Sequence, residues 1–283
     1  MNKKLFSVIT ISIVIIMIIT SVIYIVNTKK NEGNINEKVE EELDFIGKEL
    51  INMINSINNI SFNNYSLQIN KETSSNNNQK EKEDKSSDEK KSEKEVENFS
   101  LKETGILNKD LYDINWNYLK NNSEKLYNIW TTSIIDLHSL NVNNEDILEF
   151  SNKLDLSTIS SKNEDKDSFL TNLVELYSYI PKFFKQINSK KEKILVANTI
   201  DSILRSYMYV NQDNWNDTKI AIEESQKSYI QIINIYDENS LFSKYKLTRI
   251  YVLLNELDSS ISLKDKDIYF IKYQNVIEAL INL

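Results

Sequence analysis

Residues suited to acid–base or metal chemistry are scarce in this chain of 283 residues, which has one histidine, His138, and no cysteine. One histidine cannot supply the paired Glu-x-x-His motifs of a di-iron bundle or the His-Glu-x-x-His motif of a zinc protease. Without cysteine, no thiolate can act as ligand or nucleophile. Asp136 lies two residues before His138, a spacing that places the side chains on different faces of a helix. We therefore expect His138 to lie at a helix end, near the terminal carbonyls, rather than to act as a general base or metal ligand.

Carboxylates are abundant but lack the spacing of an ion site. The runs Glu40–Glu42 and Glu223–Glu224 are typical of solvated helix faces in a chain with 42 acidic residues, although such runs can serve divalent ions. Two Asp-Lys-Asp segments, Asp165–Asp167 and Asp265–Asp267, lack the glycine and final glutamate of an EF-hand loop. They fit helix starts better, where aspartates cap backbone amides and complement the helix dipole. The sequence thus predicts no catalytic residue, no metal site and no cofactor.

Aromatic side chains are the remaining candidates for recognition, since the chain has 15 Tyr, 10 Phe and 3 Trp. One group surrounds the only proline, Pro181, and a second follows it in the next predicted helix. The members are Tyr177, Tyr179, Phe183 and Phe184 in the first group, and Tyr207, Met208 and Tyr209 in the second. Core packing is the simpler interpretation of both groups. If the protein has a ligand cleft or a recognition surface, we expect it at these residues.

An uninterrupted apolar run, Leu5–Val26, lies between Lys3-Lys4 and Lys29-Lys30. It exceeds the roughly 7–15 residues of a secretory signal, and its length matches the roughly 20 residues that cross a bilayer as a helix. We predict a single transmembrane helix that contacts the lipid bilayer. Because lysines flank both ends, charge alone does not set the orientation. The short leading tail, residues 1–4, favours a cytoplasmic N-terminus at the cell membrane and an extracytoplasmic C-terminal domain.

Composition excludes several classes of protein. Three glycines and one proline are too few for a turn-rich β-sandwich or a glycine-dependent nucleotide fold. The net charge of −8, with only two arginines, does not provide the basic patch that nucleic acid requires. The richness in Asn, Ile and Lys suggests an AT-rich genome, such as that of a low-GC Gram-positive bacterium.

The segment after the apolar run, residues 36–62, carries one narrow apolar stripe at spacings of three and four. Its members are Val39, Leu43, Ile46, Leu50, Met53, Ile57 and Ile60. A helix with such a stripe needs a partner helix to cover it. Either a second copy covers it as a coiled-coil homodimer, or it folds back on the rest of the chain. Three heptads are close to the lower limit for a stable dimer, which favours folding back.

Residues 63–98 are almost entirely polar and charged, and from Asn70 to Asn98 Val96 is the only aliphatic residue. Such a segment cannot bury enough apolar area to offset the entropy of ordering its chain. We predict a disordered linker, which would let the domain that follows move relative to the membrane anchor.

Residues 99–283 read as an all-α, antiparallel helical bundle. Six further apolar stripes at spacings of three and four follow one another, separated by short polar breaks. Pro181 should start a new helical turn or kink the helix at Ile180, because it donates no amide hydrogen bond.

Internal sequence similarity suggests two repeats of about 100 residues, at 113–180 and 213–283. Four short matches recur in order: NWN at 115 and 214, SEKLY at 123 with SQKSY at 225, LDLS at 154 with LDSS at 257, and EDKDSF at 164 with KDKDIY at 264. On this alignment Ile232 occupies the position of Trp130. The segments 37–60 and 190–210 would then be equivalent lead helices, with the polar linker inserted in the first unit.

The chain resembles a family of uncharacterised membrane-anchored helical proteins of clostridia and their relatives. Three features carry the resemblance: the single span, a helix with Trp130 and His138 near its end, and a polar Asp-Lys-Asp corner. The resemblance is best over residues 113–180. It implies a membrane setting but no activity. We therefore expect a non-enzymatic, membrane-tethered interaction or structural module of the cell envelope, with a protein or envelope partner. The alternative is an extracytoplasmic helical bundle that senses a small molecule and acts through a partner protein.

Overall fold

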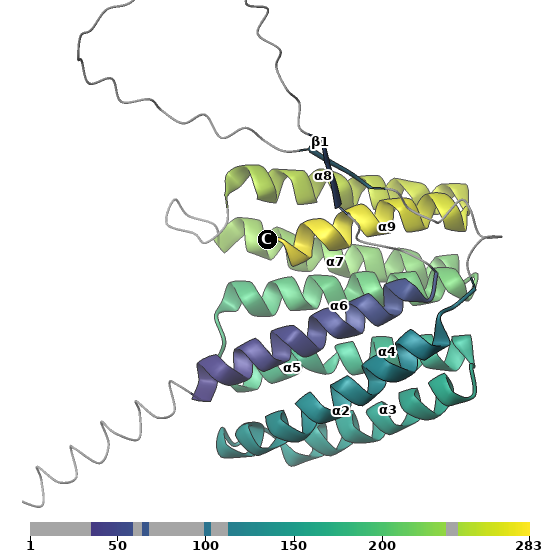
Figure 1. The fold of residues 1–283 in the computed structure, drawn as a ribbon. Helices are drawn as coiled ribbons and strands as arrows, with labels where there is room; N and C mark the ends of the chain where they lie inside the picture. The colour runs from purple at the N-terminus through teal and green to yellow at the C-terminus, as the bar shows by residue number, and fades with distance from the viewer. Residues whose placement is uncertain (1–34, 59–63, 68–98, 103–112, 236–242) are drawn as a thin grey trace, which may run out of the picture.

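The computed structural model describes residues 35–58, 64–67, 99–102, 113–235 and 243–283. Residues 35–56 form a helix, which we call the lead helix of the first unit. It is followed by two strands, β1 (Asn64–Leu67) and β2 (Phe99–Lys102), which pair antiparallel. The remaining elements are α2 (Trp116–Ser139), α3 (Asn144–Lys162), α4 (Lys166–Tyr177), α5 (Tyr179–Gln186), α6 (Lys191–Asn211), α7 (Trp215–Ile235), α8 (Lys244–Ser260), the short 3-10 helix η3 (Ile261–Leu263) and α9 (Lys266–Ile281). The helices run back and forth along one common direction (Figure 1).

The predicted all-α class is confirmed, since helices build the whole packed core. The predicted linker, residues 63–98, lies outside the described residues except for β1. The predicted bundle segment, residues 99–283, starts with β2 rather than with a helix. The predicted transmembrane helix, Leu5–Val26, also lies outside the described residues. Among the helices that the structure describes, none is long and apolar enough to cross a membrane.

The described helices form two units with the same order of elements. The first consists of the lead helix, α2, α3 and α4–α5, and the second of α6, α7, α8 and α9. Buried positions correspond within each pair of helices: 119, 122, 126 and 130 in α2 match 218, 221, 225 and 229 in α7, and 147, 150 and 154 in α3 match 247, 250 and 254 in α8. In α4 and α9, residues 169, 170 and 173 match 269, 270 and 273.

This register corrects two of the four predicted matches. The match of SEKLY with SQKSY shifts α7 by three residues, so that Ile232 would occupy the place of Trp130, and the match of LDLS with LDSS shifts α8 by three. In the structure Tyr229 occupies that place, because both side chains lie on the buried face and bind the following helix. Trp130 Nε1 donates to Ser151 Oγ at 2.8 Å, and the Tyr229 hydroxyl donates to the Leu247 carbonyl at 2.6 Å. Short matches of common residue types had produced the wrong alignment.

The lead helix docks on the bundle, as the sequence favoured. Val39, Leu43 and Leu50 are fully buried. Their stripe contacts both units: Gly47 lies against Ile180 of the first, and Asn55 binds Tyr273 of the second. Because its apolar stripe is covered within the chain, the lead helix needs no second copy for a coiled coil. It belongs to the same packed body as α2–α9, so the predicted boundary before residue 99 does not separate it from the bundle.

Helix ends in this glycine-poor chain use unusual residues. Among the described residues, five non-glycine residues have a positive φ, each just after a helix: Asn141, Glu164, Asn188, Asp213 and Lys264. The left-handed turn lets the following amides bind the last carbonyls of the helix, as when Glu164 N donates to Ser161 O at 3.2 Å. Glycine adopts this conformation without a steric penalty, whereas these residues retain one.

Pro181 interrupts the fourth helix of the first unit, as predicted. α4 ends at Tyr177 and α5 begins at Tyr179, with Ser178 between them. Proline removes the amide that would donate to the carbonyl of residue 177. The second unit has Ile281 at the equivalent position, and α9 runs from Lys266 to Ile281 without a break.

The left-handed turn after η3 yields a stability prediction. We expect Lys264→Gly to raise the free energy of unfolding by about 0.5–1 kcal/mol, because Lys264 has a φ of 50° and glycine removes the Cβ clash. Urea denaturation followed by circular dichroism measures the change. Lys264→Ala is the control, since it removes the charge but keeps the Cβ. Equal stability of the two variants would contradict the explanation.

Candidate functional site

The polar residues that sequence inspection singled out have structural partners. His138 is exposed in the last turn of α2, and its carbonyl accepts from Asn141 N at 3.1 Å, so it lies at a helix end as predicted. Within the described ranges, no group of three or more His, Asp or Glu side chains is arranged to hold a metal ion. The carboxylate runs form ion pairs: Glu40 with Lys193, Glu42 with Lys38, Glu223 with Lys219, and Glu224 with Arg205.

The two Asp-Lys-Asp corners cap helices and also tie the helices together. Asp165 Oδ1 accepts from Ser168 N at 3.2 Å, and Asp265 Oδ1 accepts from Ile268 N at 3.0 Å. These bonds satisfy amides that would otherwise be unpaired at the starts of α4 and α9. The hydroxyl and the backbone amide of Ser168 both donate hydrogen bonds to Asp165, and these bonds hold the pKa of Asp165 below its usual value. The prediction that these corners start helices is confirmed.

The lysines of the corners reach the ends of the two lead helices. Lys166 Nζ donates to Asn58 Oδ1 at 2.8 Å. Lys266 Nζ donates to the Asn211 carbonyl at 3.0 Å and pairs with Asp213 at 2.8 Å. Corresponding residues of the two units thus make corresponding contacts.

A polar cluster joins the two units where the lead helix and α6 end. Asn58 Nδ2 donates to Asn211 Oδ1 at 2.9 Å and also to the Tyr207 hydroxyl. The Tyr273 hydroxyl donates to Asn55 Oδ1 at 2.8 Å, and its ring stacks on Tyr207 with 4.4 Å between centroids. Burial raises the pKa of both tyrosines, so the hydroxyls stay neutral and bind as donors or acceptors. The cluster fixes how the lead helices align, because a shift would leave buried polar atoms without partners.

The two predicted aromatic groups are core residues and not a recognition surface. Phe183 and Phe184 are buried, and Phe183 packs with Trp130 at 5.8 Å between centroids. Tyr179 is largely buried beside Phe150, and its hydroxyl donates to Glu149 at 2.7 Å. In the second group Tyr207 is fully buried and Met208 almost so. The simpler interpretation, core packing, is therefore the correct one.

A small cavity of about 100 Å³ lies between the two units, and Tyr177 and Phe184 of the first aromatic group are among the residues that line it. It lies between the lead helix, α4–α5, α6 and the end of α9. Most of its lining is apolar: Ile51, Tyr177, Ile180, Phe184, Ile200 and Leu280 are among the residues around it. Lys193 pairs with Asp44 at 2.7 Å beside it. Gly47 in mid-helix leaves the lining without a side chain, and that lone helical glycine was the signal available in the sequence.

A charged carboxylate lies close to this cavity. Asp201 of α6 is buried, which raises its pKa, although Arg205 partly offsets the effect of burial. Arg205 binds Asp201 at 3.2 Å and bridges to Glu224 of α7 at 2.7 Å. Burial, together with Asp201 and Asp44, raises the pKa of Tyr177 as well, so this hydroxyl is neutral. The group is an ion-pair network that links α6 to α7.

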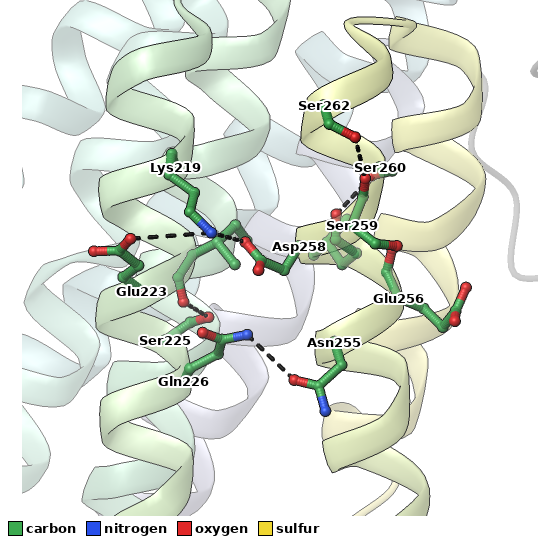
Figure 2. Close-up of polar contacts among 12 residues, drawn as sticks. Lys219, Glu223, Ser225, Gln226, Asn255, Glu256, Asp258, Ser259, Ser260 and Ser262 are labelled. Carbon is green, nitrogen blue, oxygen red and sulfur yellow. Dashed lines mark hydrogen bonds and ion pairs between the residues drawn. The ribbon is translucent and has the colours of Figure 1, made fainter.

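The outer surface carries exposed apolar side chains on two helix faces. One face is on α3, with Leu148, Leu156 and Ile159. The other lies along α7 and α8, which a polar seam joins (Figure 2). There Lys219 pairs with Asp258 at 2.7 Å, and Gln226 donates to Asn255 at 3.4 Å. Further exposed apolar residues of α7 and α8 are Ile230, Ile233, Tyr251 and Val252.

The fold and these features define a compact, two-unit helical bundle with a small, mostly apolar cavity that is partly open, and with two exposed apolar faces. Comparison with protein-family models, with curated proteins and with solved structures finds no match for this chain. Functional inference therefore starts from the geometry of the bundle itself.

The cavity at Gly47 yields a second stability prediction. A Cβ at this position would lie 3.5 Å from Tyr177 Cε2 and 3.8 Å from Ile180 Cγ2, which is ordinary contact. We expect Gly47→Ala to raise the free energy of unfolding by about 1 kcal/mol, because alanine favours the helix and fills part of the cavity. Chemical denaturation measures this change in the free energy of unfolding.

Gly47→Leu is the matched overpacking variant, and we expect it to lower stability by about 1–3 kcal/mol. If Gly47→Ala destabilised the protein as well, the helix would not tolerate any side chain there, and the observed contact distances would not describe the packing.

Proposed function

We propose that this protein is a membrane-tethered, non-enzymatic helical module of a bacterial cell envelope that binds a protein or envelope partner. In this proposal Leu5–Val26 crosses the cell membrane once, residues 1–4 are cytoplasmic, and the bundle is extracytoplasmic. The clostridial family resemblance of residues 113–180 agrees with this setting and stays a prediction.

The observation that carries the proposal is the burial of the lead helix. Only residues 27–34 separate the apolar run from the described helix, and Val39 is already fully buried in the core. An anchor followed directly by a core helix would hold the whole bundle against the bilayer, with one end facing it. In this proposal the bundle is therefore held close to the membrane, whereas the sequence had suggested that it moves freely relative to its anchor. Residues 63–98 are then an insertion within the first unit.

Binding, rather than chemistry, also agrees with the titratable groups. The carboxylate runs are occupied by lysine or arginine partners, and His138 is exposed at a helix end. The exposed apolar faces on α3 and on α7–α8 are the surfaces that a partner protein would cover, because apolar side chains gathered on one face favour association.

The second candidate, small-molecule sensing, has one supporting observation, the cavity at Gly47. A cavity of about 100 Å³ with an apolar lining suits a small apolar molecule of a few heavy atoms. Because α6 and the lead helix both line it, a ligand there would act on the contact between the two units.

Membrane extraction combined with site-specific crosslinking tests the proposal. We expect the full chain to resist alkaline carbonate extraction from membranes, and a photoreactive residue at Ile159 or Tyr251 to crosslink one defined partner in cells. Positions Glu124 and Lys227, which are exposed on polar surface, are the controls.

Release of the protein by carbonate would contradict the anchor, and equal crosslinking at all four positions would contradict a specific partner surface. A small apolar ligand that raises the thermal midpoint of the natural protein, but not that of Gly47→Ala, would support the sensing candidate instead.

A further inference from the structure

Six tyrosines of the described residues are buried, and the hydroxyls of five of them are hydrogen-bonded. The partners are Glu149 for Tyr179, Asn58 for Tyr207, the Leu247 carbonyl for Tyr229, Ser206 for Tyr269 and Asn55 for Tyr273. The sixth, Tyr177, is 3% exposed, and no side chain or backbone group of the described residues binds its hydroxyl. A buried hydroxyl without a protein partner is costly, so this exception needs an explanation.

The Tyr177 hydroxyl lies at the cavity between the two units. Tyr177 lines this cavity of about 100 Å³. A Cβ at Gly47 would lie 3.5 Å from Tyr177 Cε2, the ring atom two bonds from the hydroxyl oxygen. Because Gly47 has no side chain, this edge of the ring faces the cavity rather than a packed neighbour. One polar group that orients an otherwise apolar molecule is the usual composition of a small-molecule site.

The walls around this hydroxyl are aliphatic and aromatic. They consist mainly of Ile51 on the lead helix, Ile180 and Phe184 on α5, Val196 and Ile200 on α6, and Leu280 on α9. Water is held in a cavity by two to four polar partners, and these walls add none to the Tyr177 hydroxyl. A molecule with an apolar body gains more from burial here than water does.

The charged groups at the cavity are already paired or solvated. Asp44 and Lys193 both line the cavity and pair with each other at 2.7 Å. Lys48 lines it too but is exposed, so its ammonium group stays in water. Behind the lining, Asp201 pairs with Arg205 at 3.2 Å. A charged ligand would therefore enter a mostly apolar space without a free counter-charge, which disfavours anions and cations alike.

A neutral hydroxyl group fits the polar atoms near the cavity. The Tyr177 hydroxyl is neutral and can donate, because burial and the nearby carboxylates of Asp201 and Asp44 raise its pKa. Asp201 Oδ1 is buried and accepts no hydrogen bond from the described residues. An alcohol oxygen can accept from a tyrosine and donate its own proton to a carboxylate oxygen, whereas a ketone or an ether can only accept.

We propose that the cavity binds a short-chain alcohol whose hydroxyl group accepts a hydrogen bond from Tyr177. The inference rests on the second candidate function, small-molecule sensing, and names the ligand class for that site. An apolar cavity of about 150 Å³ holds benzene, so about 100 Å³ suits a molecule of about four heavy atoms, such as propan-1-ol. The lead helix, α5, α6 and α9 all line the cavity, so the bound alcohol contacts both units.

Methyl NMR of the full chain in detergent solution tests the inference. The methyl groups of Ile51, Ile180 and Ile200 report binding in the cavity, and those of the exposed Ile135 and Ile220 report non-specific effects of the added compound. The probes are propan-1-ol, propionate and propylammonium, which have three carbons each and differ in charge. Xenon is the fourth probe, because it needs only an apolar cavity.

We expect propan-1-ol to shift the three cavity signals saturably, with a Kd of about 1 mM, because four heavy atoms bind no tighter than about 0.05 mM. Propionate and propylammonium should bind at least about tenfold more weakly. Tyr177→Phe removes only the hydroxyl, so it should weaken propan-1-ol at least about fivefold and leave xenon binding unchanged. Tyr118→Phe, at an exposed tyrosine, is the matched control and should bind like the natural protein.

Gly47→Ala tests the location of the site. Its methyl group would occupy part of the cavity, so it should weaken both propan-1-ol and xenon. Unchanged binding of both probes would place them elsewhere and overturn the inference.

The other outcomes separate the ligand class from the candidate function. Equal affinity of the natural protein and Tyr177→Phe for propan-1-ol would overturn the inference, as would propylammonium or propionate that binds as tightly as the alcohol. Xenon shifts without alcohol shifts would also overturn it, but would leave an apolar cavity for the sensing candidate. If none of the four probes shifts the cavity signals, the inference and the sensing candidate both fall.

Discussion

The architecture depends on the covering of one apolar stripe. A helix with a single apolar face is not stable alone in water. Each aliphatic side chain that it buries in the bundle contributes about 1.5–3 kcal/mol to the free energy of unfolding. The lead helix buries Val39, Leu43 and Leu50 against helices from both units. Without it the first unit would lack its first helix, the cavity would lose one wall, and the polar cluster would lose Asn55 and Asn58.

Apolar burial alone does not choose one alignment of two similar helices, because a shift by one turn buries comparable area. The polar cluster supplies the choice. Asn58 binds Asn211, its equivalent in the second unit, while Lys166 and Lys266 bind the two helix ends. A shifted arrangement would break these bonds and would leave the fully buried hydroxyls of Tyr207 and Tyr273 without partners, at a cost of about 1–3 kcal/mol for each hydroxyl. The alignment of the two lead helices is thus chosen by a few polar contacts, while most of the stability comes from the burial of the apolar stripes.

The sequence predicted what depends on local pattern. Spacings of three and four located α2, α4 and α6–α9, although no predicted stripe marked α3. Pro181 located the break between α4 and α5, and the aspartates at 165 and 265 located two helix starts. The lead helix was predicted to fold back because its stripe was too short for a stable dimer. These features are set by residues within one or two turns of each other.

What could not be predicted depends on residues far apart in the chain. The equivalence of Trp130 and Tyr229 follows from their burial, whereas the matched letters are common residue types that many alignments satisfy. Whether Tyr177 and Phe183 face a cleft or the core depends on α3 and α6, which no local spacing reveals. The cavity at Gly47 needs four elements at once, so in the sequence only the aromatic group around Pro181 and an isolated helical glycine indicate it.

The differences between the two units are as informative as their likeness. Their cores correspond position by position, so packing explains the shared residues and leaves the unshared ones to be explained otherwise. Pro181 breaks the first unit just where the chain must leave α4 and turn into α6, whereas α9 continues without a break to Ile281.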